Sequence, residues 1–103
     1  MFLNNSAKAC GGAYILSDVL MENVEFSGNS AIGGNGGGCN VSKNSTIEGC
    51  VFFNNIAKTQ GGGAYLANAT VKNTTFENNT SDTSEGGGIY STGTTTIENS
   101  KFI

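Results

Sequence analysis

The sequence predicts an all-β protein whose backbone winds into a parallel β-solenoid of about four coils. Three observations predict this fold. A phenylalanine recurs with spacings of 24, 26, 24 and 26 residues, a glycine run recurs between these phenylalanines, and no segment keeps the apolar period of an amphipathic helix. A unit this short cannot bury a core alone, so successive units must stack on each other. The phenylalanines are Phe2, Phe26, Phe52, Phe76 and Phe102.

Two apolar positions in each unit predict columns of side chains inside the solenoid. The phenylalanines form one column, because equivalent residues of successive coils lie over each other at about 4.8 Å. An aliphatic residue or methionine stands five residues before each later phenylalanine and predicts a second column of Met21, Ile47, Val71 and Ile97. The predicted units cover residues 2–25, 26–51, 52–75 and 76–101 of one domain, 1–103.

An asparagine follows each of the first four phenylalanines by three residues, at Asn5, Asn29, Asn55 and Asn79. We expect these amides to point inward and to bond to the amides above and below them and to the backbone of their turn. Such bonds are needed because a buried amide without a partner costs about 1–3 kcal/mol. The predicted role of this column is structural.

Glycine runs predict the tightest corner of each coil, because glycine adopts positive φ without strain and lets the backbone approach closely. The runs are Gly11-Gly12, Gly36 to Gly38, Gly61 to Gly63 and Gly86 to Gly88. The longer stretch GGNGGG, from Gly33 to Gly38, lacks the strand-to-helix context and the Lys-Ser/Thr ending of a phosphate-binding loop. It is therefore predicted to be a turn.

The segments FLNNSAKACGGAY and FFNNIAKTQGGGAY carry the pattern Phe-x-x-Asn followed by Gly-Gly-Ala and an aliphatic residue or tyrosine. This pattern resembles the repeats of the chlamydial polymorphic membrane proteins and of similar bacterial or protist surface proteins, and the resemblance covers essentially the whole chain. It implies a right-handed parallel β-helix that serves as an exported passenger with an adhesive surface. The departures are Cys39-Asn40 after the second glycine run, and Ser81 and Ile89 in the fourth unit.

Charge and hydropathy limit the partners. Eight acidic residues against five lysines give a net charge of −3, which argues against nucleic acid or an anionic membrane as the partner. No apolar run approaches the ~18 residues of a membrane span, and the first residues, MFLNNSAK, lack the basic and apolar regions of a signal peptide. We expect an extracellular or cell-surface location, an export signal outside this segment, and no cofactor.

The three cysteines fit no zinc pattern, because the sequence has no C-x-x-C motif and no histidine. Cys39 and Cys50 align with small or apolar residues of the other units, so we expect them to be buried, unpaired core thiols. Cys10 directly precedes the first glycine run, a position compatible with exposure at the surface.

An enzyme is a weaker hypothesis. Parallel β-helices include polysaccharide lyases and hydrolases, whose sites need converging carboxylates, or acidic clusters that hold Ca²⁺ beside a cationic residue. The chain has no arginine and no histidine, and Asp18 and Asp82 stand at different positions of the coil. A column of Glu22, Glu48, Lys72 and Glu98 is expected to face solvent. We therefore expect no catalytic residue and no metal site.

The outer faces raise further hypotheses. Tyr14, Tyr65 and Tyr90 should point outward, with Asn40 breaking their row, and such a row either contacts glycans or proteins or shields strand edges. A threonine column of Thr46, Thr70 and Thr96 suggests ice binding, but Leu20 interrupts it. Asn-x-Ser/Thr triplets would be glycan acceptors in a eukaryotic secreted protein and chance products of composition in a bacterium. They begin at Asn4, Asn40, Asn44, Asn68, Asn73, Asn78 and Asn79.

The predicted function is a non-enzymatic structural or adhesive surface domain, with a host-surface protein or glycan as its partner. The sequence starts and stops near the same position of the coil, which leaves two hypotheses open. The chain is either a segment of a longer passenger, or a unit that stacks head to tail on itself into an extracellular fibre.

Overall fold

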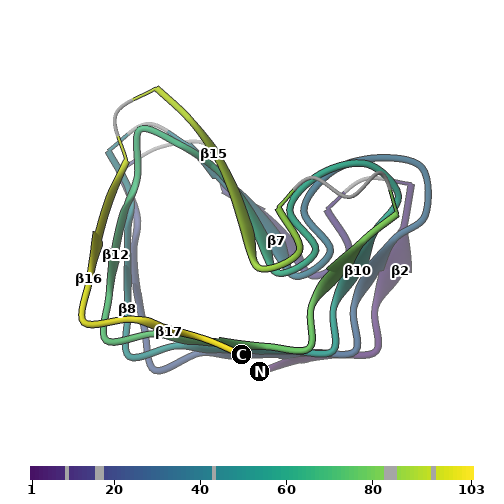
Figure 1. Ribbon diagram of the computed structural model, residues 1–103, viewed down its shortest axis with the longest axis horizontal. Helices are drawn as coiled ribbons and strands as arrows, with labels where there is room; N and C mark the ends of the chain where they lie inside the picture. The colour runs from purple at the N-terminus through teal and green to yellow at the C-terminus, as the bar shows by residue number, and fades with distance from the viewer. Residues whose placement is uncertain (9, 16–17, 43, 83–85, 94) are drawn as a thin grey trace.

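The computed structural model describes residues 1–8, 10–15, 18–42, 44–82, 86–93 and 95–103. These residues form short strands that assemble into four parallel sheets, and the backbone visits one strand of each sheet in turn on every lap (Figure 1). The body measures 26 × 22 × 20 Å. The prediction of an all-β parallel solenoid of about four coils is confirmed.

Sheets A and B follow each other along every coil. Sheet A contains β1 (Phe2–Leu3), β5 (Glu25–Ser27), β9 (Val51–Phe53), β13 (Thr75–Glu77) and β17 (Lys101–Phe102). Sheet B contains β2 (Ser6–Ala7), β6 (Ser30–Ala31), β10 (Ile56–Ala57) and β14 (Thr80–Ser81). A lobe of backbone beyond sheet B then returns the chain to the glycine run, and the outline of the coil is indented there (Figure 1).

Sheets C and D complete the lap. Sheet C contains β3 (Ala13–Ile15), β7 (Cys39–Ser42), β11 (Ala64–Ala67) and β15 (Ile89–Thr92). Sheet D contains β4 (Leu20–Glu22), β8 (Thr46–Glu48), β12 (Thr70–Lys72) and β16 (Thr96–Glu98). Equivalent residues pair in register across all four sheets, as in Phe26 opposite Phe52 and Val71 opposite Ile47.

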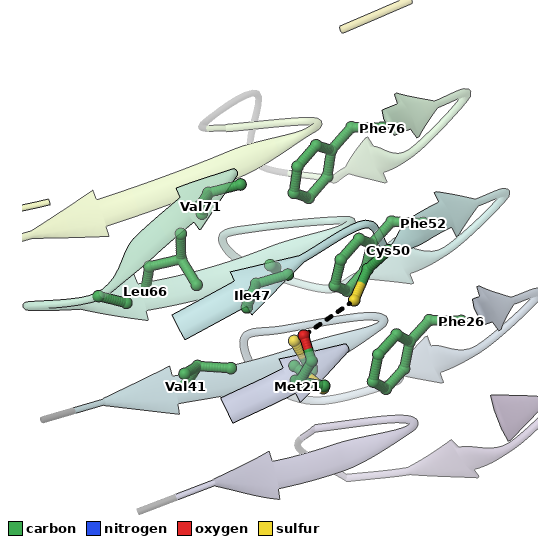
Figure 2. Packing of buried hydrophobic residues seen from close by; sticks show 12 residues of the cluster. Met21, Phe26, Val41, Ile47, Cys50, Phe52, Leu66, Val71 and Phe76 are labelled. Atoms are coloured by element: carbon green, nitrogen blue, oxygen red, sulfur yellow. Dashed lines mark hydrogen bonds between the residues drawn. The ribbon is translucent and has the colours of Figure 1, made fainter. Parts of the chain in front are cut away.

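The phenylalanines form a single stack inside the solenoid. Successive rings from Phe2 to Phe102 are 4.6–5.0 Å apart between centroids and lie within 4–7° of parallel. Figure 2 shows Phe26, Phe52 and Phe76 one above the other. The last glycine of each run makes room for the stack, because a Cβ on Gly38 would lie 2.8 Å from the ring of Phe52.

The aliphatic column lies on the inner face of sheet D. Met21, Ile47 and Val71 are buried. Ile97 is 44% exposed, because it lies in the last coil of residues 1–103 and has a neighbouring strand on one side alone. The inner face of sheet C adds Val41 and Leu66, which lie near this column (Figure 2). The core is therefore a set of parallel columns rather than one cluster around a centre.

The asparagines three residues after each phenylalanine form a continuous amide ladder. The carboxamide oxygen of Asn55 accepts bonds from the backbone N–H of Asn29 at 2.9 Å and from its Nδ2 at 3.1 Å. The Nδ2 of Asn55 donates to the Phe26 carbonyl and to Oδ1 of Asn79, both at 2.9 Å. Asn5 donates to Asn29 in the same way, so each coil bonds to the next through side chains as well as strands.

Each coil turns four corners, and one residue with positive φ stands at every corner. The column between sheets A and B is Asn4, Gly28, Asn54 and Asn78. The column between C and D is Asp18, Asn44, Asn68 and Gly93. The column between D and A is Asn23, Gly49, Asn73 and Asn99. The column before sheet C is Cys10, Gly36, Gly61 and Gly86.

Candidate functional site

The outer face of sheet C carries the most aromatic surface column of the described residues. Side chains alternate between the two faces of a strand, so the tyrosines project outward while Ala64 and Leu66 point into the core. The rings of Tyr65 and Tyr90 stack with centroids 5.3 Å apart and planes within 18°. Tyr14 lies in the same column and is 61% exposed. Outer phenol rings of adjacent coils therefore stack as the inner phenyl rings do.

Asn40 interrupts this column between Tyr14 and Tyr65. The register places Tyr14 opposite Asn40 in β7, and Asn40 opposite Tyr65 in β11. Asn40 is half-buried, and its side chain lies near the Cys10 thiol, where it partly offsets the rise in the pKa of Cys10 that burial causes. The second coil thus replaces a ring with a short carboxamide that contacts the preceding corner.

Cys10 stands at the corner itself rather than beside it. The sequence was compatible with exposure at this position, but Cys10 is buried, with 9% of its surface exposed. Its φ is 56°, in the column where the other coils have Gly36, Gly61 and Gly86. A residue with a Cβ in this conformation is strained by roughly 1–2 kcal/mol, which glycine avoids.

All three cysteines are buried free thiols. Burial raises the pKa of Cys39 well above its usual range, with smaller contributions from the neighbouring thiols of Cys50 and Cys10. Burial also raises the pKa of Cys10, against an opposing contribution from its hydrogen bond with Asn40. The Cys50 thiol donates to the Met21 carbonyl at 3.4 Å, and its pKa is likewise raised by burial (Figure 2). Thiols held protonated in this way are poor nucleophiles at neutral pH.

The charged and threonine columns both lie on sheet D. Glu22 pairs in register with Glu48, and Lys72 stands between Glu48 and Glu98. Thr46, Thr70 and Thr96 form the neighbouring column, which begins with Leu20. Among the described residues, no three cysteine, aspartate or glutamate side chains gather where they could hold a metal ion.

The asparagines of the Asn-x-Ser/Thr triplets separate into three structural groups. Asn4, Asn44, Asn68, Asn73 and Asn78 are exposed corner residues with φ between 48° and 59°. Asn79 belongs to the amide ladder, where its Nδ2 donates to the Phe52 carbonyl at 2.9 Å. Asn40 is the residue in β7. Six of these seven asparagines therefore have a structural role in the coil that accounts for their presence without a glycan.

Comparison with known proteins identifies the class. The family model of the right-handed β-helix region matches residues 1–102, so the chain belongs to this family. Neither the curated proteins nor the solved structures give a match. In the described part of the chain, no helix has the length and apolar character needed to cross a membrane.

Sequence reasoning missed two features of the outer surface. Three of the four corner columns went unrecognised, because each mixes asparagine with glycine or aspartate and none keeps one residue type in every coil. A search for any of these residues at a fixed distance from phenylalanine would have found them, since Asn4, Gly28 and Asn54 each follow a phenylalanine by two residues. The contact between Cys10 and Asn40 leaves no sequence signal, since they are thirty residues apart.

Proposed function

We propose that the chain is a non-enzymatic section of an extracellular β-helical rod, and that the outer face of sheet C is its binding surface. The observation that carries this proposal is the outward tyrosine column on sheet C, whose strands pair in register from coil to coil. Tyrosine is enriched at interfaces because it offers a large apolar ring with a polar tip. The passenger role implied by the repeat resemblance agrees with such a display.

The placement of the carboxylates supports a non-enzymatic role. Asp18 lies at the corner between sheets C and D, and Asp82 follows β14 on another side of the coil. Glu22 and Glu48 face solvent from sheet D. Asp18 and Asp82 therefore do not form the acid–base pair that a hydrolase places on either side of one bond.

The proposal is tested by coating fluorescent beads with the chain and measuring their attachment to cultured epithelial cells by flow cytometry. A variant with serine at Tyr14, Tyr65 and Tyr90 should lose most of the attachment while keeping its β-sheet circular dichroism. A matched variant with serine at Val51 and Phe53, on the outer face of sheet A, should retain it. Equal attachment of all three proteins would contradict a binding role for sheet C.

Head-to-tail stacking is the second candidate. It is favoured by Ile97 and Phe102, which belong to inner columns and are 44% and 49% exposed. However, sheet A has five strands and each other sheet has four. Two copies that continued each other's coils would place β1 of one copy where β17 of the other lies. Electron microscopy of the full chain and of a version lacking residues 101–103 tests this, since stacking predicts longer rods for the shortened chain.

A further inference from the structure

Two departures from the repeat meet at one place on the outer face of sheet C. Cys10 occupies a corner that glycine holds in the other coils, and Asn40 occupies a position that tyrosine holds in the other coils. The two side chains lie close enough to interact. A strained residue that replaces the favoured one, in contact with a second irregular position, is typical of a functional site.

The break at Asn40 is one coil long and lies between Tyr14 and Tyr65. Coils repeat at about 4.8 Å, so the positions of Tyr14 and Tyr65 lie about 9.6 Å apart along the axis. The inner stack shows that this spacing accepts a ring, since Phe26 lies 4.8 Å from Phe2 and 4.8 Å from Phe52. On the outer face, Tyr65 already stacks on Tyr90 at 5.3 Å. The second coil therefore lacks one ring in a column that otherwise stacks rings.

We propose that Tyr14, Asn40 and Tyr65 bind the side chain of a tyrosine on a partner protein. This proposal rests on the proposed binding role of sheet C and names the chemistry of the ligand. The ring of the incoming tyrosine stacks between Tyr14 and Tyr65 and completes the column. Its hydroxyl reaches the carboxamide of Asn40, which has both a donor and an acceptor. The carboxamide also interacts with the side chain of Cys10.

Tyrosine fits this position better than an aliphatic side chain or a sugar. Aromatic rings attract each other in offset stacks with centroids 4.5–7 Å apart, and stacks within this range are what the inner and outer columns show. A tyrosine also enters tip first, so its hydroxyl arrives at the polar floor of the site. A leucine would leave Asn40 without a new partner, and a sugar ring lacks the π-face that both walls offer.

The test titrates the full chain, labelled with ¹⁵N, with N-acetyl-L-tyrosinamide and follows the side-chain amide signals of Asn40 by NMR. We expect saturable shifts with a dissociation constant in the millimolar range. Tyr14→Ser should weaken binding at least tenfold, because it removes one wall. Asn40→Tyr should abolish it, because the chain then fills its own column. Phe53→Ser, on the outer face of sheet A, is the matched control and should bind normally, because both walls remain.

Three results would overturn the proposal. They are the absence of shifts at Asn40, equal shifts with N-acetyl-L-leucinamide, and shifts with methyl β-D-glucopyranoside in place of the tyrosine derivative. The thermal midpoint of each variant shows that it is folded, and Asn40→Tyr should raise it by completing the stack.

The same variants distinguish the tyrosine site from the adhesive role proposed for sheet C. Bead attachment that survives both Tyr14→Ser and Asn40→Tyr would leave the rod a binding module and remove the tyrosine site. Normal binding of N-acetyl-L-tyrosinamide without any bead attachment would establish the site and remove the adhesive role.

Discussion

The segment Phe52-Phe53-Asn54-Asn55 contains two identical pairs whose members lie in opposite environments. Phe52 is fully buried between Phe26 and Phe76, whereas Phe53 lies on the outer face of sheet A and is only half-buried. Asn55 is fully buried in the amide ladder, whereas Asn54 is an exposed corner residue with a φ of 56°. Inward positions thus depend on a particular side chain, and corner positions depend on a backbone conformation.

This difference explains which columns keep one residue type. The phenylalanine and asparagine columns keep one residue type throughout the described coils, because stacking and amide bonding both require the same group above and below, whereas the aliphatic column varies between methionine, isoleucine and valine. The corner columns mix asparagine with glycine, because either residue tolerates positive φ. Substitutions at neighbouring positions can therefore distinguish the requirement for a particular side chain from the requirement for a positive φ.

The largest difference is expected within the phenylalanine pair. Phe52→Ala removes a fully buried ring from the stack and should lower the free energy of unfolding by about 3–5 kcal/mol. Phe53→Ala, one residue later and on the outer face, should lower it by no more than about 1 kcal/mol. Urea unfolding followed by circular dichroism measures both. Similar losses for the two variants would show that the inner stack has no special weight.

The asparagine pair should show the second largest difference. Asn55→Leu leaves the backbone N–H and the Nδ2 of Asn29 without their acceptor, and unpaired buried groups of this kind should cost about 3 kcal/mol in total. Asn54→Gly keeps the positive φ at an exposed corner, so we expect a change within about 0.5 kcal/mol. Hydrogen exchange of the Asn29 amide provides a local readout, which should accelerate in the first variant alone.

The glycines should also differ in how much stability their substitution costs, according to whether a side chain would meet backbone atoms or a flexible side chain. A Cβ on Gly62 would lie 2.3 Å from the Thr80 carbonyl oxygen and 2.5 Å from that of Gly87, so Gly62→Ala should destabilise the fold by about 1–3 kcal/mol. A Cβ on Gly28 would come closest to the flexible side chain of Asn4, in a column that holds asparagine at Asn54 and Asn78, so Gly28→Asn should be close to neutral. The thermal midpoints of the two variants test this. A larger loss for Gly28→Asn would show that corner identity matters beyond φ.

The inner columns were predictable from the sequence because a strict spatial repeat imposes a strict chemical one. Phe26, Phe52 and Phe76 recur at nearly equal intervals, and the family match to residues 1–102 supports the fold that this spacing predicts. The exposure of Ile97 and the burial of Cys10 were not predictable in the same way. The exposure of Ile97 depends on what covers the last coil. The burial of Cys10 depends on which residue stands at the corner, and the repeat pattern specifies neither of these.

The smallest expected effect is the pH dependence of stability that the buried thiols cause. It should be larger for Cys39, inside the solenoid, than for Cys10, at a corner. Burial raises the pKa of these thiols in the folded state above the unfolded value of about 9.0. As the pH rises beyond that value, the thiols of the unfolded chain lose their protons first, so the free energy of unfolding falls. Stability should therefore be constant up to about pH 8.5 and fall toward pH 10.5. Cys39→Ala, which places alanine between Ala13 and Ala64 in its column, should flatten this fall more than Cys10→Ala. The reason is that burial raises the pKa of Cys39 further, whereas the bond with Asn40 opposes the shift of Cys10. Urea midpoints at pH 7.5 and 10 measure both slopes, and an equal flattening would show that full enclosure in the column does not set the acidity of Cys39.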